Sequence, residues 1–225
     1  MQNTSIIQPS PITYGHIAEP SKIGSVHGMA VALKFGNGDE ESKRRQLIGI
    51  ADISCLSRFG VKGPNAVQWL RAHKVDLPEE RNSWVATSSG AVVLRLGNSE
   101  FLIEDSPTSS LAPSLASDPP KMFGVYTVRR SDASLVLSGS RVQELLAEVC
   151  TLDLSEKALG KNAVVMTQVA GISATVLRQS LNGETVYRLW CDGTYGTYMW
   201  HTLVEIAEEL GGGAVGLSSY FKELA

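Results

Sequence analysis

The spacing of apolar residues changes from the period of a strand to the period of a helix at two places in the chain. Phe59 and Val61 alternate with their neighbours, as residues of a half-buried strand do, and the apolar positions after Gly63 follow helical spacing. The same change occurs around Gly139, which lies 76 positions after Gly63. The helical positions of the second copy are Val142, Leu145, Leu146 and Val149. The pattern therefore predicts one strand-turn-helix unit that is used twice.

Both copies also carry signals for the start of a helix. Pro64 follows a glycine and suits the first helical position, while the run from Ser140 to Gln143 has the form of a capping box. These signals predict helices at 64–74 and 140–150.

A hairpin pattern follows each predicted helix. Gly97-Asn98 and Asn182-Gly183 each separate two apolar runs, and Asn-Gly between such runs is the strongest local signal for a hairpin. We therefore predict an α+β fold in which two related strand-helix-hairpin modules pack together. Chance similarity between two ordinary α+β segments is the alternative explanation.

Composition and proline spacing predict how the modules are bounded. The expected parts are an extended N-terminal arm (1–24), a first module (25–104), a proline-bearing linker loop (105–123), a second module (124–213) and a C-terminal tail (214–225). The apolar residues of the tail are expected to dock against the body or against a neighbour.

Three shorter segments at the start of the first module also give expectations. Residues 26–35 and 47–53 have strand-like composition, and the polar residues 36–45 separate them. The pattern predicts a hairpin of two strands joined by a polar connection.

Composition restricts the classes of function. Of the 225 residues 43% are hydrophobic, and the formal net charge is only -3 without a basic stripe, so the chain is globular and a nucleic-acid partner is not expected. An odd number of separated cysteines favours a reducing compartment. The first residues have neither the basic nor the apolar region typical of a signal peptide, and no apolar run approaches the ~18 residues that span a bilayer. We therefore expect a cytoplasmic protein that does not contact the membrane.

The usual signatures of catalysis and metal binding are weak or missing. The four histidines never occur at ligand spacing with one another or with a cysteine, so no metal site is predicted. His73 is expected to be a core or boundary residue, and His201 is expected to pair with Glu205 on a solvated helix face. The glycines at 211–213 follow a helix, which predicts a helix end rather than a phosphate-binding loop.

One segment rich in aromatic residues is a candidate for ligand binding. Trp190, Asp192 and Tyr195 surround a predicted strand-to-helix turn, where a helix N-terminus beside aromatic rings suits a flat, anionic ligand. The alternative interpretation is that these aromatic residues anchor the core or an interface.

The first half of the chain resembles a known family. The sequence Asp52-Ile-Ser, followed by a strand, Gly63-Pro64 and a helix, resembles the opening of the folate-binding aminomethyltransferases, the glycine-cleavage T-proteins. The second half, with Leu135-Val-Leu-Ser-Gly139 and Tyr195-Gly-Thr-Tyr-Met-Trp200, is similar to the gamma subunit of heterotetrameric sarcosine oxidase. The similar subunit of N-methylglutamate dehydrogenase fits the same pattern. The resemblance implies the fold of the T-protein N-terminal domain.

Departures from the T-protein pattern determine what the resemblance implies for function. T-proteins carry a Thr-Gly-Tyr-Thr-Gly-Glu-like turn for folate, and the corresponding run from Cys191 to Tyr198 lacks the glutamate in register. The resemblance therefore implies an accessory subunit, without a catalytic residue or a cofactor of its own, of a flavin complex that oxidises an N-methyl amino acid such as sarcosine or N-methylglutamate. Larger flavoprotein subunits would hold the flavin and pass the one-carbon unit to tetrahydrofolate. The alternative is a stand-alone folate-binding protein that uses Asp192, Tyr195 and Trp190.

Overall fold

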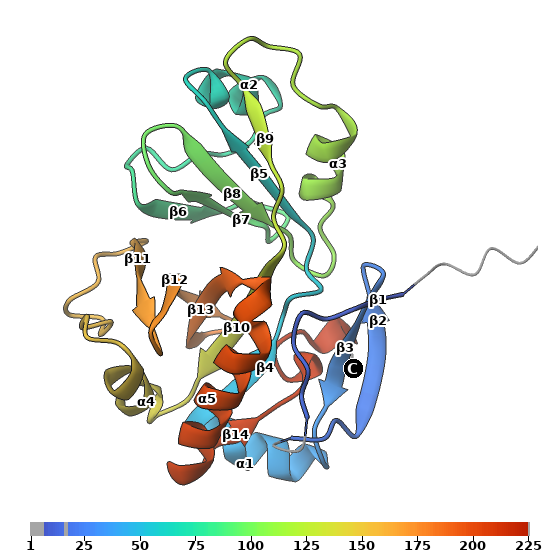
Figure 1. The fold of residues 1–225 in the computed structure, drawn as a ribbon, viewed down its shortest axis with the longest axis vertical. Helices are drawn as coiled ribbons and strands as arrows, with labels where there is room; N and C mark the ends of the chain where they lie inside the picture. Colours follow the sequence, from blue (N-terminus) through green and yellow to red (C-terminus); the bar gives the residue numbers. More distant parts are fainter. Residues whose placement is uncertain (1–6, 16–17, 225) are drawn as a thin grey trace, which may run out of the picture. The chain divides into compact units, whose positions relative to one another are not determined.

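The computed structural model describes residues 7–15 and 18–224, which form two compact units. The first unit combines the chain up to residue 55 with residues 132–160 and the chain from residue 166 onwards (Figure 1). The second unit combines residues 56–131 with residues 161–165. Each unit therefore contains segments that the sequence pattern places in different consecutive modules.

The first unit contains two sheets. The smaller sheet has the order β1-β3-β2 and consists of β1 (Gln8–Pro9), β2 (Lys22–Val26) and β3 (Met29–Lys34). The larger sheet has the order β11-β12-β13-β10-β4-β14. Its strands are β4 (Gly49–Asp52), β10 (Asp132–Ser138), β11 (Val164–Val169), β12 (Ile172–Leu181), β13 (Glu184–Asp192) and β14 (Gly213–Ala214).

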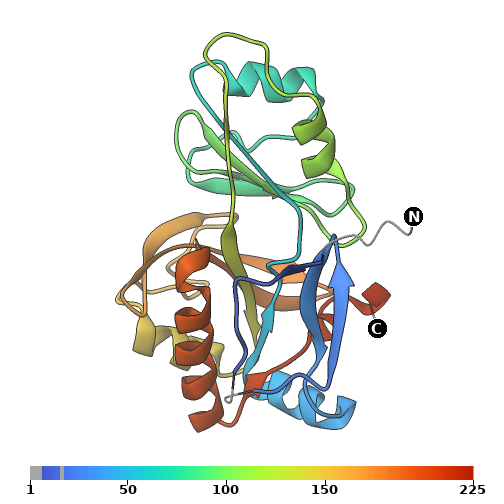
Figure 2. The ribbon, with the colours of Figure 1, turned by 45° about the vertical axis from the view of Figure 1, so that its right-hand side comes forward.

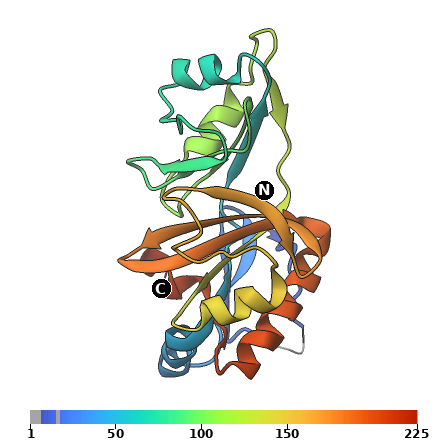
Figure 3. The same cartoon turned by 90° about the vertical axis from the view of Figure 1, so that its left-hand side faces the viewer.

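Three α-helices accompany these sheets. They are α1 (Gly38–Ile48), α4 (Val142–Val149) and α5 (Gly196–Glu209), and three short 3-10 helices are η1 (Gly193–Tyr195), η2 (Leu217–Ser219) and η3 (Lys222–Leu224). Figure 2 shows α5 running along the strands β4 and β10, and Figure 3 shows the long hairpin β12–β13 beside α4. The apolar side of α5 is buried, as its helical spacing predicts.

The second unit contains one sheet and two helices. Its five strands have the order β6-β7-β8-β5-β9. They are β5 (Arg58–Lys62), β6 (Ser83–Ala86), β7 (Val92–Arg95), β8 (Glu100–Glu104) and β9 (Tyr126–Val128). The helices α2 (Ala66–Ala72) and α3 (Leu111–Ser117) pack on one side of this sheet, where Trp69, Phe101 and Leu115 join one buried apolar cluster.

The two units share one strand topology, which confirms the predicted α+β duplication. The sheet order β6-β7-β8-β5-β9 corresponds, strand for strand, to β11-β12-β13-β10-β4. In each unit a helix connects the fourth strand of this order to the first, as α2 connects β5 to β6 and α4 connects β10 to β11. The chain then continues through the second strand to the third, which pair as a hairpin. The fifth strand comes from the other half of the chain, because β4 precedes β5 in sequence and yet pairs with β10. This exchange explains why each compact unit is discontinuous.

Gly63 and Gly139 occupy equivalent positions at the start of the two helices. Their φ angles are 123° and 114°, a region that favours glycine, and each carbonyl accepts a hydrogen bond from the first residue of the helix. These bonds join Ala66 N to Gly63 O (3.0 Å) and Val142 N to Gly139 O (3.3 Å). The two helices each begin two residues later than the sequence predicts, and the predicted capping box is wrong, because the Ser140 hydroxyl donates to Gln46 O instead.

The exchanged strands approach the two glycines in the same way. Asn65 N donates to Gly124 O (3.2 Å), two residues before β9, and Arg141 N donates to Leu47 O (3.0 Å), two residues before β4. A Cβ atom on Gly63 would collide with Gly124 O, and one on Gly139 would collide with Leu47 O. Both glycines are therefore required by sterics as well as by φ.

The structure of residues 26–53 differs from the prediction in three respects. The strand predicted at 26–35 is shorter, since only residues 29–34 form β3, while Val26 ends β2 and a turn at His27 and Gly28, with φ of 47° and 80°, joins the two strands. Residues 36–45 are not a polar connection, since most of them lie in α1, which a capping box between Asn37 and Glu40 starts. This helix buries only Glu41 and Ile48 and has no apolar stripe, so periodicity cannot reveal it. The following strand β4 pairs in the larger sheet and not with β3.

The segment at 105–123 contains the helix α3 and is not only a loop. Pro113 occupies the third helical position, in the first turn where its missing N–H is not needed. The buried carboxylate of Asp105 accepts hydrogen bonds from Leu111 N and Ala112 N, both at 3.1 Å. Asp105 thus satisfies the free amides of the helix start from six residues upstream.

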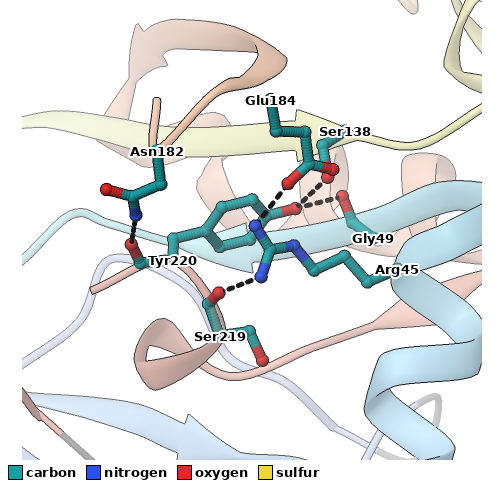
Figure 4. Close-up of polar contacts among 7 residues, drawn as sticks. All are labelled: Arg45, Gly49, Ser138, Asn182, Glu184, Ser219 and Tyr220. Carbon is teal, nitrogen blue, oxygen red and sulfur yellow. Dashed lines mark hydrogen bonds and ion pairs between the residues drawn. The ribbon is translucent and has the colours of Figure 1, made fainter. Parts of the chain in front are cut away.

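The C-terminal segment packs against the body of the first unit. Val215, Leu217 and Tyr220 are fully buried, and the Tyr220 hydroxyl lies 2.9 Å from both Ser138 Oγ and Gly49 O (Figure 4). The Arg45 guanidinium lies 4.6 Å from the centre of the Tyr220 ring.

Two further contacts hold the same segment in place. Arg45 also pairs with Glu184 and donates to Ser219 O, and the Asn182 amide donates to Tyr220 O at 3.0 Å (Figure 4). Of the two alternatives for the tail, the structure therefore shows docking against the body.

Candidate functional site

The predicted ligand residues lie around the turn between β13 and α5, but only part of the group is accessible. Trp190 is 1% exposed and lies under the Arg188 guanidinium, 5.4 Å from its ring centre. Asp192 is exposed and accepts hydrogen bonds from Thr194 N (2.8 Å) and Thr194 Oγ1 (2.6 Å), which lower the pKa of its carboxyl. Tyr195 is 48% exposed. The structure thus brings Asp192 and Tyr195 together on one turn and leaves Trp190 in the sheet.

The N-terminal arm occupies the start of α5. Pro11 O would lie 2.8 Å from a Cβ atom on Gly196, and Thr13 N donates to Thr197 Oγ1 at 3.0 Å. Nε2 of His201 lies 3.0 Å from Thr13 O. His201 therefore contacts the arm, whereas the sequence predicts a pair with Glu205. The first turns of α5, which sequence reasoning offers as an anion site, are partly covered by the chain itself.

A buried carboxylate fixes the same arm to the larger sheet. Asp52, at the end of β4, accepts hydrogen bonds from Ser10 Oγ (2.5 Å), Tyr14 Oη (2.9 Å) and Ser54 N (2.8 Å). Tyr14 Oη in turn accepts from Ala32 N at 2.9 Å, so its own proton points to Asp52. Burial raises the pKa of the Asp52 carboxyl, and the three donors oppose that shift.

Aromatic side chains enclose Tyr14 on the other side. Its ring centre lies 5.5 Å from that of Phe35 and 5.3 Å from that of Trp200, both with edge-to-face geometry. Burial and the nearby Asp52 charge raise the pKa of the Tyr14 hydroxyl, which keeps its proton at neutral pH. Ser10, Tyr14 and Asp52 thus fasten the arm to the sheet through hydrogen bonds. A ligand would have to displace the arm to reach the Asp52 carboxylate.

This burial leads to a prediction about pH. The folded protein binds the Asp52 proton more tightly than the unfolded chain does, so the stabilising contribution is present below the ordinary pKa and is lost as the pH rises through the raised value. Relative to Asp52→Asn, the wild-type chain should therefore gain unfolding free energy as the pH is lowered from neutral. Urea unfolding of both proteins over a pH series measures the difference.

The exposed Asp76 provides the control for that experiment. Asp76→Asn should follow the pH dependence of the wild-type chain. A difference between wild type and Asp52→Asn that stays constant across the pH series would show that the carboxyl of Asp52 titrates alike in the folded and unfolded states.

Two adjoining hollows lie beside α4, and no sequence pattern predicts them. The first has a volume of about 240 Å³ and the second about 300 Å³, and Gln143 lines both. The residues lining the first are Gly139, Ser140, Val142, Gln143, Ser155, Glu156, Arg178, Thr185 and Tyr187. The second lies along α4 as far as Cys150 and continues over residues 151–154. No sequence signal marks these residues, because they come together only when the hairpin β12–β13 packs on α4.

The first hollow has the chemistry to hold a carboxylate. Arg178 is the cation among the described residues that line this hollow. It pairs with Glu156 at 3.3 Å, and the side chain of Glu156 is 78% exposed. The Arg178 side chain is only 19% exposed, so the pair is partly buried, and a ligand carboxylate would have to take the place of Glu156 beside the guanidinium. Tyr187 Oη donates to Leu154 O (2.9 Å) and accepts from the Gln143 amide, and is already engaged.

Neither a group of metal-ligating side chains nor an activated Cys191 thiol is found in the described residues. Among residues 7–15 and 18–224, no group of three or more His, Cys, Asp or Glu side chains is placed to hold a metal ion. Burial raises the pKa of the Cys191 thiol to about 11, which suppresses its thiolate. The His73 ring centre lies 4.2 Å from that of Trp69 with the rings tilted by 43°, and its Nε2 lies 3.2 Å from Asp118, which places it at the boundary of the core. In the same described residues no helix is long and apolar enough to cross a membrane.

Curated relatives in sequence are aminomethyltransferases. The enzyme of Thermus thermophilus is 28% identical over 201 residues, covering 82% of this chain and 56% of the relative. The enzyme of Moorella thermoacetica is 24% identical over 229 residues, covering 95% and 62%. The chain thus spans about three-fifths of the length of these relatives.

Solved structures with low sequence identity share the fold. Aminomethyltransferase T of the glycine cleavage system from Bartonella henselae superimposes with a TM-score of 0.71 at 18% identity, covering 95% of this chain and 61% of that one. A chain of the heterotetrameric sarcosine oxidase from Corynebacterium sp. U-96 gives 0.60 at 21% identity, covering 79% and 93%. The sequence model of the GCVT N-terminal domain matches residues 12–221, so this chain belongs to the GCVT N-terminal domain family.

Proposed function

We propose that this chain is an accessory, gamma-type subunit of a heteromeric flavoprotein complex. The complex oxidises an N-methyl amino acid such as sarcosine or N-methylglutamate and transfers the one-carbon unit to folate. Larger partner subunits hold the flavin and carry out the oxidation. This chain contributes a folded module to the assembly and no catalytic residue.

The fold shared with a chain of a heterotetrameric sarcosine oxidase carries this proposal. The alignment covers 93% of the sarcosine oxidase chain but only 56–62% of the aminomethyltransferases named above. The fold of this chain thus matches most of one chain of a heteromeric oxidase, which supports a role as a subunit of such an assembly.

The state of the predicted ligand residues supports the same proposal. Trp190 is buried, Asp192 caps its own turn, and residues 11–14 of the arm lie against the start of α5. A flat ligand at this turn would find Tyr195 as its accessible aromatic surface. With so few accessible groups at this turn, the oxidation reaction is better placed on another chain of the complex.

Purification from the native source tests the proposal. We expect the full-length chain to co-purify with a larger protein that carries flavin absorbance and oxidises sarcosine or N-methylglutamate. Mass spectrometry identifies the partner, and the isolated chain serves as the control that should show neither flavin nor activity. A chain that elutes as a free monomer without any flavoprotein would contradict the proposal.

Titration with tetrahydrofolate separates the accessory role from a stand-alone folate-binding role. We expect no micromolar binding by the purified chain alone. Micromolar binding that Tyr195→Ala abolishes would place folate at the turn formed with Asp192 and would favour the stand-alone role.

A further inference from the structure

One segment of the second unit carries exposed aromatic side chains together with basic ones. Phe123 is 88% exposed and Tyr126 is 56% exposed, and they are separated by two residues. Residues 119–131 contain three basic side chains and no acidic one, although the whole chain has a net charge of -3. The basic residues are Lys121, Arg129 and Arg130. We call residues 121–129 the aromatic-basic segment.

The backbone holds Phe123 in its exposed position. The side-chain amide of Asn65 donates to Phe123 O at 2.9 Å, and Asn65 N donates to Gly124 O at 3.2 Å. Gly124 has a φ of 71° and packs on Pro64, and the next residue, Val125, is buried in the core of the unit. Because the segment is already ordered, a partner that binds Phe123 does not have to pay the entropy of fixing it.

The segment also includes the outer strand of a sheet. β9 is the last strand in the order β6-β7-β8-β5-β9, and it pairs with β5 alone in that sheet. An outer strand presents N–H and C=O groups that can pair with an added strand of another chain. Tyr126 lies directly opposite the exposed Lys62 of β5, so another positive charge adjoins the aromatic side chains.

We propose that the aromatic-basic segment is the docking surface for an extended, acidic segment of a larger partner polypeptide. This inference rests on the proposed function and names the part of the chain that binds the flavoprotein. The partner segment adds a strand to β9, sets an apolar side chain against Phe123 and Tyr126, and places carboxylates near Lys121 and Arg129. Backbone pairing and aromatic burial supply affinity, and charge complementarity selects the partner.

A double variant tests the aromatic part of this surface. Phe123→Ser with Tyr126→Ser should weaken binding to the purified flavoprotein partner at least about tenfold, since aromatic anchors dominate interface energetics. Ile23→Ser is the matched control, because Ile23 is 61% exposed on β2, an outer strand of another sheet, and it should leave the dissociation constant within about twofold. Both proteins should keep the thermal unfolding midpoint of the wild type, since the substituted side chains are largely exposed.

Charge reversal tests the chemistry of the partner. Lys121→Glu with Arg129→Glu should weaken binding and reduce its dependence on salt concentration, because these charges lie in the proposed contact. Unchanged affinity in both double variants, with wild-type chain still bound to its flavoprotein, would overturn the docking surface and leave the proposed function intact. A wild-type chain that binds no flavoprotein would overturn both. Self-association that the aromatic double variant abolishes would show a second copy of this chain as the occupant, and would overturn the acidic partner.

Discussion

Gly139→Ala is expected to destabilise the first unit by about 2–5 kcal/mol, a large part of the about 5–15 kcal/mol that folded domains have. The residue has a φ of 114°, where an L side chain is strained, and its new Cβ would collide with Leu47 O. That carbonyl cannot simply move away, because it accepts a hydrogen bond from Arg141 N at 3.0 Å and leads into β4. Chemical denaturation followed by circular dichroism measures the loss.

The repeated architecture provides a second copy of the same experiment. Gly63→Ala should produce a loss of similar size in the second unit, because its Cβ would collide with the equivalent carbonyl, Gly124 O. Gly97→Ala is the control, since its position has open space around an added Cβ and no positive φ. If both Gly63→Ala and Gly139→Ala unfold at the denaturant concentration of wild type, the exchanged strands do not make these close approaches in solution.

Tyr220→Ala should destabilise the first unit by about 3–5 kcal/mol. The side chain is fully buried, and its removal leaves a cavity beneath the Arg45 guanidinium (Figure 4). It also leaves Ser138 Oγ and Gly49 O without the hydroxyl that bonds them in the wild type. Urea denaturation monitored by tryptophan fluorescence gives the change in unfolding free energy.

A milder variant separates the two contributions. Tyr220→Phe keeps the ring and removes only the hydroxyl, so it should cost about 1–3 kcal/mol, the usual penalty for an unsatisfied buried group. Deletion of residues 222–225 should cost less than either, since Lys222 and Glu223 are exposed. Wild-type stability in Tyr220→Ala would mean that the C-terminal segment detaches in solution, and the tail would then be free to bind a neighbour.

Local structure follows from the residues themselves wherever a turn or a period has one favoured conformation. Asn182 and Gly183 have φ angles of 53° and 82°, and two positive φ values are what a tight hairpin turn between β12 and β13 requires. Gly63 and Gly139 mark the two strand-to-helix turns for the same reason. These features depend on a few consecutive residues, so a single sequence is enough to locate them.

Which distant segments come into contact depends on tertiary packing. The exchange of β4 and β9 cannot be read from periodicity, because an apolar strand fits beside any partner with a compatible face. The helix α1 forms with a capping box and two buried side chains, and Glu41 among them accepts from the backbone of Gly216, 175 residues away.

The candidate sites depend on the same long-range packing. Burial of Trp190 in the sheet and occupation of the α5 start by the arm both involve residues that are distant in sequence. Arg178 lines a hollow only because the hairpin that carries it packs on α4. The sequence shows which chemical groups a side chain carries. Its exposure and its partners depend on the free energy of the whole fold, to which residues distant in sequence also contribute.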